Sequence, residues 1–204
     1  MKFSIVTLSV DPKSFDGDYS KKRNELMKKS STDWIFFVDT DETYDQHLID
    51  EIASLPEEGS LYLIPRVDLL DGTKLNFGES GHQYLTRLVN RKKGQWVRPV
   101  HEVFVAKVTG KLKHVIYHHK NQFVTEHLSK ISLYGHTDAL CLNKEGKTFS
   151  YLRLLFYPKL KFLKNYFFKL GFLDGTLGLF HAYLMYIQSL SNRVFQWESR
   201  SHIS

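Results

Sequence analysis

The sequence predicts an α/β domain in which a sheet is flanked by helices, and three features lead to this prediction. Residues 35–38, Ile-Phe-Phe-Val, form a continuous apolar run, which is typical of a strand covered on both faces. A helical pattern and a second apolar strand follow, so strand, helix and strand alternate. Carboxylates come directly after the first apolar run, at the strand end where open α/β sheets bind ligands.

Residues 1–64 alternate predicted strands and helices. The apolar pattern predicts, in order, a strand at Phe3–Val10, a helix at Tyr19–Lys29, a strand at Ile35–Val38, a helix at Tyr44–Leu55 and a strand at Leu61–Ile64. Thr43 is the expected N-cap of the second helix. This order of elements favours a parallel strand–helix–strand unit.

The second half of the chain changes from predicted strands to predicted helices near residue 124. Two hairpins are expected, one pairing Tyr84–Asn90 with Gln95–Val97 and one pairing Val103–Val108 with Leu112–His118. Helical patterns follow from Val124 to Gly146, with Thr125 as N-cap, and from Thr148 to Tyr157, with Pro158 as the stop. We therefore expect a main domain at residues 1–147 and a helical segment at residues 148–204.

Size and composition indicate one well-packed domain with a small appendage. The chain has 204 residues, of which 42% are hydrophobic, and this is enough to bury a substantial core. The single cysteine, Cys141, excludes an intramolecular disulfide and a cysteine-based zinc site. The first ten residues are too short and too β-branched for a signal peptide, so a cytoplasmic protein is expected.

Charge is distributed in two opposing blocks. Residues 33–58 hold nine acidic side chains and no Lys or Arg, whereas residues 80–125 hold nine Lys or Arg and one acid, Glu102. An acidic segment that faces a basic one suits a ligand made of a metal and a phosphate, because carboxylates hold the cation and basic groups hold the anion. The alternative is two separate solvated surfaces, which charge runs often are.

Asp39 and Asp41 form a D-x-D pattern at the end of the apolar strand. Residues i and i+2 of a strand point the same way, so the two carboxylates can converge. Oxygen ligands are those that Mg²⁺ or Mn²⁺ prefers, and a bound cation can also hold phosphates. The alternative is a strand exit with a solvated acidic turn, since D-x-D is short and common.

The C-terminal region combines basic and aromatic residues. Residues 151–170 contain five Lys or Arg, seven aromatic residues and no acid, and an apolar but glycine-interrupted segment follows. This composition fits a membrane surface on anionic lipid, and the alternative is a helical pair packed on the domain. The basic pI, near 9.2, would also suit nucleic acid. No nucleic-acid-binding motif is present, so no such partner is expected.

Four stretches together resemble the family 2 glycosyltransferases of the GT-A fold, above all the bacterial lipopolysaccharide-core and cell-surface-glycan subgroup. These stretches are Asp18–Asn24, which precedes the metal motif, Asp33–Glu42 with the D-x-D strand, Arg91–Glu102 with its basic turn and Val-His-Glu, and Phe167–Gly175. The resemblance covers roughly Asp18 to Glu198. It implies a GT-A-like, Rossmann-like mixed sheet that is N-terminally abbreviated, because only one short strand precedes Asp18, and a membrane-associated helical C-terminal segment.

The resemblance also implies a reaction, an inverting, metal-dependent transfer of a sugar from a nucleotide-sugar donor to a cell-envelope glycan or lipid-linked acceptor. Mg²⁺ or Mn²⁺ would be the cofactor, and the protein would lie on the inner face of the cell membrane. The alternative is a catalytically impaired remnant of the fold that binds a glycan or a membrane. The short N-terminal region favours that alternative.

Candidate residues follow from the pattern and from the resemblance. Asp41, Asp39 and His118 are the expected metal ligands, with Asp39 also directed at the ribose. The expected donor-binding residues, besides Asp39, are Arg23, Asn24, Arg87, Arg91 and Arg98, since guanidinium groups pair with phosphate. Glu102 is the expected general base, and His101 is expected to orient either the acceptor or Glu102. A loop ion pair and a hydrogen-bonded loop histidine are the alternatives for these two.

Overall fold

A computed structural model describes residues 1–9, 17–99, 101–147 and 149–199, and it divides into two compact units. Unit 1 comprises Met1–Val67 and Gln83–His119, and unit 2 comprises Asp68–His82 and Lys120–Ser204. This division differs from the expected boundary after residue 147. The loop at 68–82 and the helix that begins at Phe123 are joined to the C-terminal helices by packing and hydrogen bonds, so both belong to unit 2.

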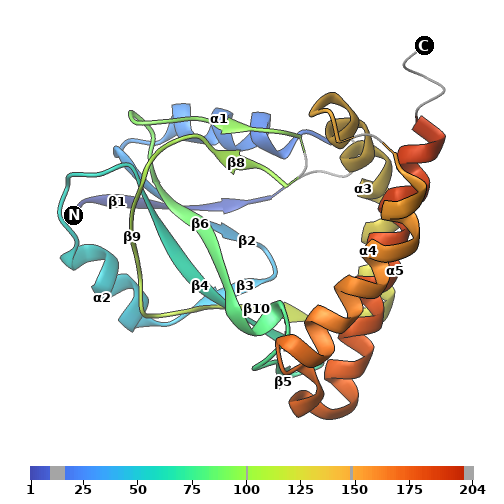
Figure 1. Cartoon of the computed structure of the whole chain (residues 1–204). Coiled ribbons are helices and arrows are strands. Elements are labelled where there is room, and N and C mark those ends of the chain that lie inside the picture. Colours follow the sequence, from blue (N-terminus) through green and yellow to red (C-terminus); the bar gives the residue numbers. More distant parts are fainter. Residues whose placement is uncertain (10–16, 100, 148, 200–204) are drawn as a thin grey trace. The chain divides into compact units, whose positions relative to one another are not determined.

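The predicted α/β class is confirmed, because a mixed sheet with flanking helices forms the fold (Figure 1). Its strands run in the order β1 (Phe3–Leu8), β2 (Trp34–Asp39), β6 (Gln83–Asn90), β4 (Leu61–Leu70), β10 (Ile116–Lys120) and β3 (Glu42–Tyr44), with β5 (Thr73–Lys74) and β9 (Val108–Lys111) paired to β4. β1 and β2 are parallel, and β6 is antiparallel to both β2 and β4. Only two residues separate β2 from β3 in the sequence, yet β3 lies at the far end of the strand order. Because so short a connection keeps the two strands close in space, the sheet must curl.

Strand β2 is buried on both of its faces, as its apolar run predicts. Alternate residues pack into separate cores, with Phe36 in the core that includes Leu48 and Ile52 of α2 (Gln46–Ser54). Phe37 lies in the other core, with Met27 of α1 (Tyr19–Lys29). The two helices therefore cover opposite faces of the sheet at β2 (Figure 1).

The two flanking helices begin at aspartate caps. The side chain of Asp18 accepts a hydrogen bond from the Lys21 backbone nitrogen at 2.9 Å, so α1 begins at Tyr19 as predicted. Asp45 caps α2 through the Leu48 nitrogen at 3.0 Å. The prediction of Thr43 as this cap was wrong, because Thr43 belongs to strand β3, where it pairs with β10.

Both predicted hairpins are wrong, since the strands pair with partners distant in sequence. β6 already has β2 on one edge and β4 on the other, so no edge is left for the residues after it. Those residues form β7 (Trp96–Val97), which pairs with β8 (Val103–Phe104) in a small separate sheet. β9 pairs in parallel with β4, and β10 pairs with β3. The predicted first strand is confirmed over Phe3–Leu8, while Val10 lies outside the described residues.

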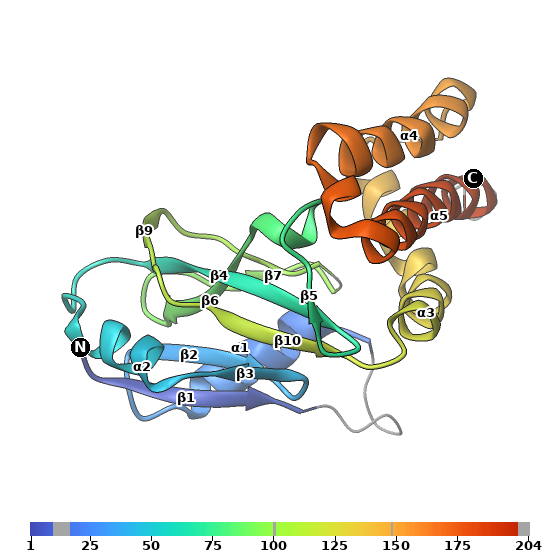
Figure 2. The ribbon, with the colours of Figure 1, turned by 90° about the horizontal axis from the view of Figure 1, so that it is seen from below.

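Unit 2 is built on three long helices, α3 (Phe123–Lys144), α4 (Tyr151–Leu163) and α5 (Gly175–Ser199). Figure 2 shows α5 between α3 and α4. A π-helical turn, η2 (Lys164–Phe168), and a 3₁₀ turn, η3 (Gly171–Asp174), connect α4 to α5.

Three predicted helix ends in unit 2 have different outcomes. The predicted end of α3 at Gly146 is close to the observed one, and Gly146 adopts a φ of +76°, as a glycine beyond a helix end does. The predicted cap at Thr125 was wrong, because α3 begins at Phe123. The predicted stop at Pro158 was also wrong. Proline costs the helix one hydrogen bond, but α4 continues through it to Leu163. Thr148 lies outside the described residues.

Polar side chains fasten the loop before β6 to the turns between α4 and α5. The Asp174 carboxylate accepts hydrogen bonds from the Asn76 and Phe77 nitrogens at 3.2 and 2.9 Å. Asn165 accepts one from the Glu79 nitrogen at 2.8 Å. These bonds satisfy backbone groups that regular structure leaves unpaired.

The same loop contacts a buried histidine, His181 of α5. The Ser80 hydroxyl lies 2.8 Å from its Nε2 atom. Burial of the imidazole, reinforced by the positive charge of Lys120, lowers the pKa of His181 from 6.5 to about 4. The folded unit therefore holds this histidine neutral.

The lowered pKa of His181 predicts a pH-dependent stability. The unfolded chain protonates His181 more readily than the folded chain does. The stability that the neutral His181 contributes is therefore complete above pH 6.5 and is lost as the pH falls toward about 4. The loss amounts to roughly 3 kcal/mol. Urea unfolding between about pH 7 and about pH 4.5 should show a weaker pH dependence for His181→Gln than for the wild type. The exposed control His47→Gln should retain the wild-type slope, and equal slopes for all three proteins would contradict this assignment.

Candidate functional site

Asp39, the last residue of β2, lies between two arginines from different elements. Its Oδ1 atom accepts a hydrogen bond from Arg23 of α1 at 3.1 Å, and its Oδ2 atom accepts one from Arg87 of β6. The pairing of Phe36 with Leu88 brings Arg87 alongside the end of β2. Both oxygens of Asp39 are therefore engaged by guanidinium groups, which holds the carboxylate in one orientation.

Arg23 is buried and joins the site to the core. Its guanidinium carbon lies 5.1 Å from the ring centroid of Phe37 and 5.0 Å from that of Trp96. Its Nε atom donates a hydrogen bond to Glu102 at 2.8 Å. Two aromatic faces and two carboxylates thus compensate for the burial of one cation.

Glu42 is a member of this cluster that the sequence alone did not single out for a role. Its side chain is 1% exposed, and it accepts hydrogen bonds from Arg87 at 2.6 Å and from the Asp39 backbone nitrogen at 3.0 Å. Burial would lower the pKa of Arg87, but attraction by Asp39 and Glu42 outweighs that effect and raises it. The one available signal in the sequence was its place directly after D-x-D.

Asp41 and His118 form a second pair beside this cluster. Nε2 of the buried His118 lies 3.1 Å from Oδ2 of Asp41, whose side chain is 42% exposed. The neighbouring His119 lies instead 2.9 Å from the Thr43 hydroxyl. The two histidines therefore point to opposite faces of β10, as expected for adjacent strand residues, and only His118 reaches Asp41.

A divalent cation at this site would need several side-chain ligands close together. Among the residues that the structure describes, no three His, Cys, Asp or Glu side chains form a group that could hold a metal ion. Asp41 and His118 contact each other and offer an oxygen and a nitrogen, whereas Asp39 faces two arginines. Asp41 offers carboxylate oxygens, and one or two carboxylates are what Mg²⁺ usually takes from a protein. The metal-ligand role of Asp41, Asp39 and His118 stays a prediction.

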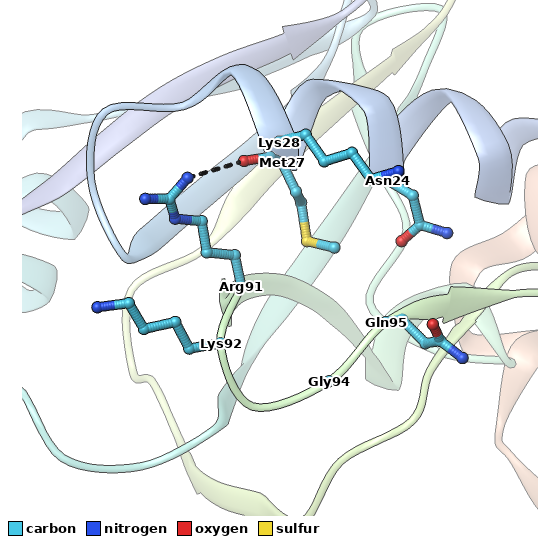
Figure 3. Close-up of a pocket in the computed structure, with 7 residues that line it drawn as sticks. All are labelled: Asn24, Met27, Lys28, Arg91, Lys92, Gly94 and Gln95. Carbon is cyan, nitrogen blue, oxygen red and sulfur yellow. Dashed lines mark hydrogen bonds between the residues drawn. The ribbon is translucent and has the colours of Figure 1, made fainter.

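Two other predicted donor-binding residues lie away from Asp39. Asn24 donates to the Trp96 carbonyl at 2.9 Å and accepts from the Trp96 nitrogen at 3.0 Å, so it joins α1 to β7. Arg91 donates to the Ser30 carbonyl at 2.8 Å, just beyond the end of α1. Figure 3 shows its guanidinium pointing toward the Met27 carbonyl.

Asn24 and Arg91 line a pocket of about 550 Å³. The other residues that line it are Met27, Lys28, Lys92, Gly94 and Gln95 (Figure 3). Three of the lining residues, Lys28, Arg91 and Lys92, are basic and give the pocket a positive character. The role of Asn24 and Arg91 in donor binding stays a prediction, and the contacts that they make in this structure support the backbone.

Arg98 and His101 lie just before Glu102 in the sequence, and both have unusual backbone angles. Their φ values are +75° and +52°, in the left-handed region that non-glycine residues seldom adopt. Backbone strain of this kind is often found at functional sites. The intervening Val100, the first residue of the Val-His-Glu turn, lies outside the described residues. The orienting role predicted for His101 stays a prediction.

Comparison with known proteins gave no family assignment, because neither the protein-family models nor the curated proteins include a match to this chain.

The buried cluster predicts a large loss of stability when one of its partners is removed. Arg87→Met should lower the free energy of unfolding by roughly 3–5 kcal/mol, since Glu42 would then be buried without its cation and Asp39 would keep only Arg23. Glu42→Met should also destabilise, and the double variant should lose clearly less than the sum of the single losses. Chemical unfolding of the wild type, the two single variants and the double variant measures the coupling free energy between Arg87 and Glu42.

Lys92→Ala is the matched surface control, because it removes an ion pair with Asp33 in which the lysine side chain is mostly exposed. Little change in unfolding is expected for it. Additive losses in the Arg87 and Glu42 cycle would show that the two side chains do not act as a pair.

Proposed function

We propose that this chain is a glycosyltransferase of the GT-A type, resembling family 2, that transfers a sugar with inversion from a nucleotide-sugar donor. The observation that carries the proposal is the arrangement at the end of β2. A half-exposed Asp41 is paired with His118 there, next to a carboxylate that two arginines hold in place. Glu102 belongs to the same network through Arg23. A glycan or lipid-linked acceptor of the cell envelope is the proposed second substrate.

The contacts suggest a division of roles between the two aspartates. Asp41 and His118 would hold Mg²⁺ or Mn²⁺, and such a cation would replace the direct contact that the two side chains now make. When bound, the cation neutralises the charge that develops on the leaving diphosphate. Asp39 would position the strand end and Arg87 rather than bind the metal, since its oxygens are already engaged.

Glu102 is the proposed general base. The acceptor hydroxyl oxygen forms a bond to the anomeric carbon while its proton passes to the Glu102 carboxylate. The bond from the anomeric carbon to the diphosphate breaks, and the diphosphate leaves with the electron pair. Attack from the side opposite to the leaving group inverts the configuration. The hydrogen bond from Arg23 Nε fixes one oxygen of Glu102, which orients the carboxylate as a base requires.

The proposal predicts that Asp41 and Glu102 affect different steps. Calorimetry with UDP, GDP and CDP should detect binding of at least one nucleotide in the presence of Mn²⁺. Asp41→Asn should weaken this binding by about tenfold or more, because it removes a charged ligand. Glu102→Gln should bind the nucleotide normally but lose about 10²- to 10⁴-fold in turnover of the matching nucleotide sugar.

Asp33→Asn is the control, because Asp33 is an exposed acid that pairs with Lys92 at the other end of β2. It should leave binding and turnover unchanged. Unfolding curves exclude a loss of fold in the Asp41 and Glu102 variants. Absence of binding for every nucleotide, with and without Mn²⁺, would contradict the proposal and favour a domain that binds glycans without transfer.

A further inference from the structure

Helix α4 exposes an apolar stripe along one face. Leu152, Phe156, Leu160, Leu163 and Phe167 recur at intervals of three or four residues, so they share one side of the helix. All five are exposed large hydrophobic side chains, with Leu152 at 69%. Monomeric soluble domains seldom expose a contiguous apolar surface of this length, so the stripe indicates a binding surface.

The stripe continues into the turn between α4 and α5, which we call the tip (residues 167–173). Phe168 is 82% exposed, and Leu170, Phe172 and Leu173 are exposed as well. Leu170 has a φ of +58°, a strained angle for a leucine, and it presents its side chain to solvent.

The tip is a close-packed turn rather than a frayed helix end. A Cβ atom on Gly178 would lie 1.9 Å from the Gly171 carbonyl oxygen, and one on Gly171 would lie 2.6 Å from the Asn165 carbonyl oxygen. Only glycine permits these approaches of one backbone to another. The fold therefore holds the apolar tip in a defined shape.

Basic side chains accompany the apolar ones. Residues 151–170 hold five Lys or Arg and no acid. Lys159 and Lys164 are exposed on α4 and η2, next to stripe residues in the sequence. Long basic side chains beside an apolar face are typical of surfaces that contact anionic lipid, because the stems lie along the apolar layer and the charges reach the headgroups.

The helices around the tip have the composition, but not the shape, of a spanning segment. In the described part of the chain, no single helix is long and apolar enough to cross a membrane. Tyr151–Phe168 and Gly171–Ser199 pass the length and composition criteria only as a pair, and the pair is bent by 71°. A bent apolar pair of this kind suits a segment that enters one leaflet and returns.

We propose that the α4 stripe and the tip form a docking surface for an anionic lipid bilayer, with the tip inserted among the acyl chains and Lys159 and Lys164 at the headgroups. The combination of apolar tip, exposed stripe and basic side chains, two of which, Lys161 and Lys164, also pair with Glu79, favours lipid over a second copy of the chain. Two copies would bring like charges together. The inference depends on unit 2 alone and is independent of the proposed transfer reaction.

Co-sedimentation of the full chain with vesicles tests this proposal. Vesicles of phosphatidylcholine and phosphatidylglycerol should bind the chain about tenfold or more tightly than vesicles of phosphatidylcholine alone. The double variant Phe167→Ser/Phe168→Ser should lose about tenfold or more of this binding, because it removes two large exposed aromatic groups of the tip, including the most exposed one, Phe168. Lys159→Glu/Lys164→Glu should lose the preference for anionic vesicles.

Val103→Ser/Val105→Ser is the matched control, since both valines are exposed apolar residues of unit 1. It should bind vesicles as the wild type does, and unchanged circular dichroism shows that each variant folds. Vesicle binding that is unchanged in the tip variant would overturn the proposal. Self-association that the tip variant abolishes, together with no vesicle binding by the wild type, would overturn it in favour of a second copy.

Discussion

The buried charge cluster at the end of β2 is the interaction on which unit 1 depends. Arg23 and Arg87 share Asp39, and each also holds a second carboxylate, Glu102 or Glu42. Isolated buried charges are very costly, so each member requires its partners to be in place. The cluster therefore links α1, β2, β3, β6 and the turn before β8, which are far apart in the sequence.

The cluster also explains why the apolar run of β2 stops where it does. The side chains at positions 34–38 are buried, and hydrophobic packing alone would allow the strand to slip along its neighbours. The pairing of Asp39 with Arg87 specifies one register, and the bond from the Asp39 nitrogen to Glu42 directs the chain into β3. Polar groups thus supply specificity, while the two cores supply most of the stability.

Local signals predicted the elements of the fold better than their partners. Apolar spacing and a terminal glycine predicted α1, most of α2 and the end of α3, because these features act within a few residues, although the aspartate caps of α1 and α2 were not predicted. The hairpins failed because strand pairing depends on which edges are free, and β6 has none. In the site, D-x-D predicted the position of the carboxylates. The hydrogen bond from Arg23 to Asp39 depends on how α1 packs beside β2. No local sequence pattern predicts that packing.

The two aspartates of D-x-D, Asp39 and Asp41, differ in their contacts and exposure, which their spacing in the sequence does not predict. Residues two apart on a strand would present equivalent carboxylates, but β2 ends at Asp39 and Asp41 lies in the turn to β3. Asp39 is consequently fixed by buried cations, and Asp41 stays half-exposed beside a histidine. Under the proposed function, a ligand that approaches this edge of the sheet would meet Asp41, which is half-exposed and paired with His118. The cluster fixes Asp39, from which the chain turns into β3, and so it holds the base of the turn that carries Asp41.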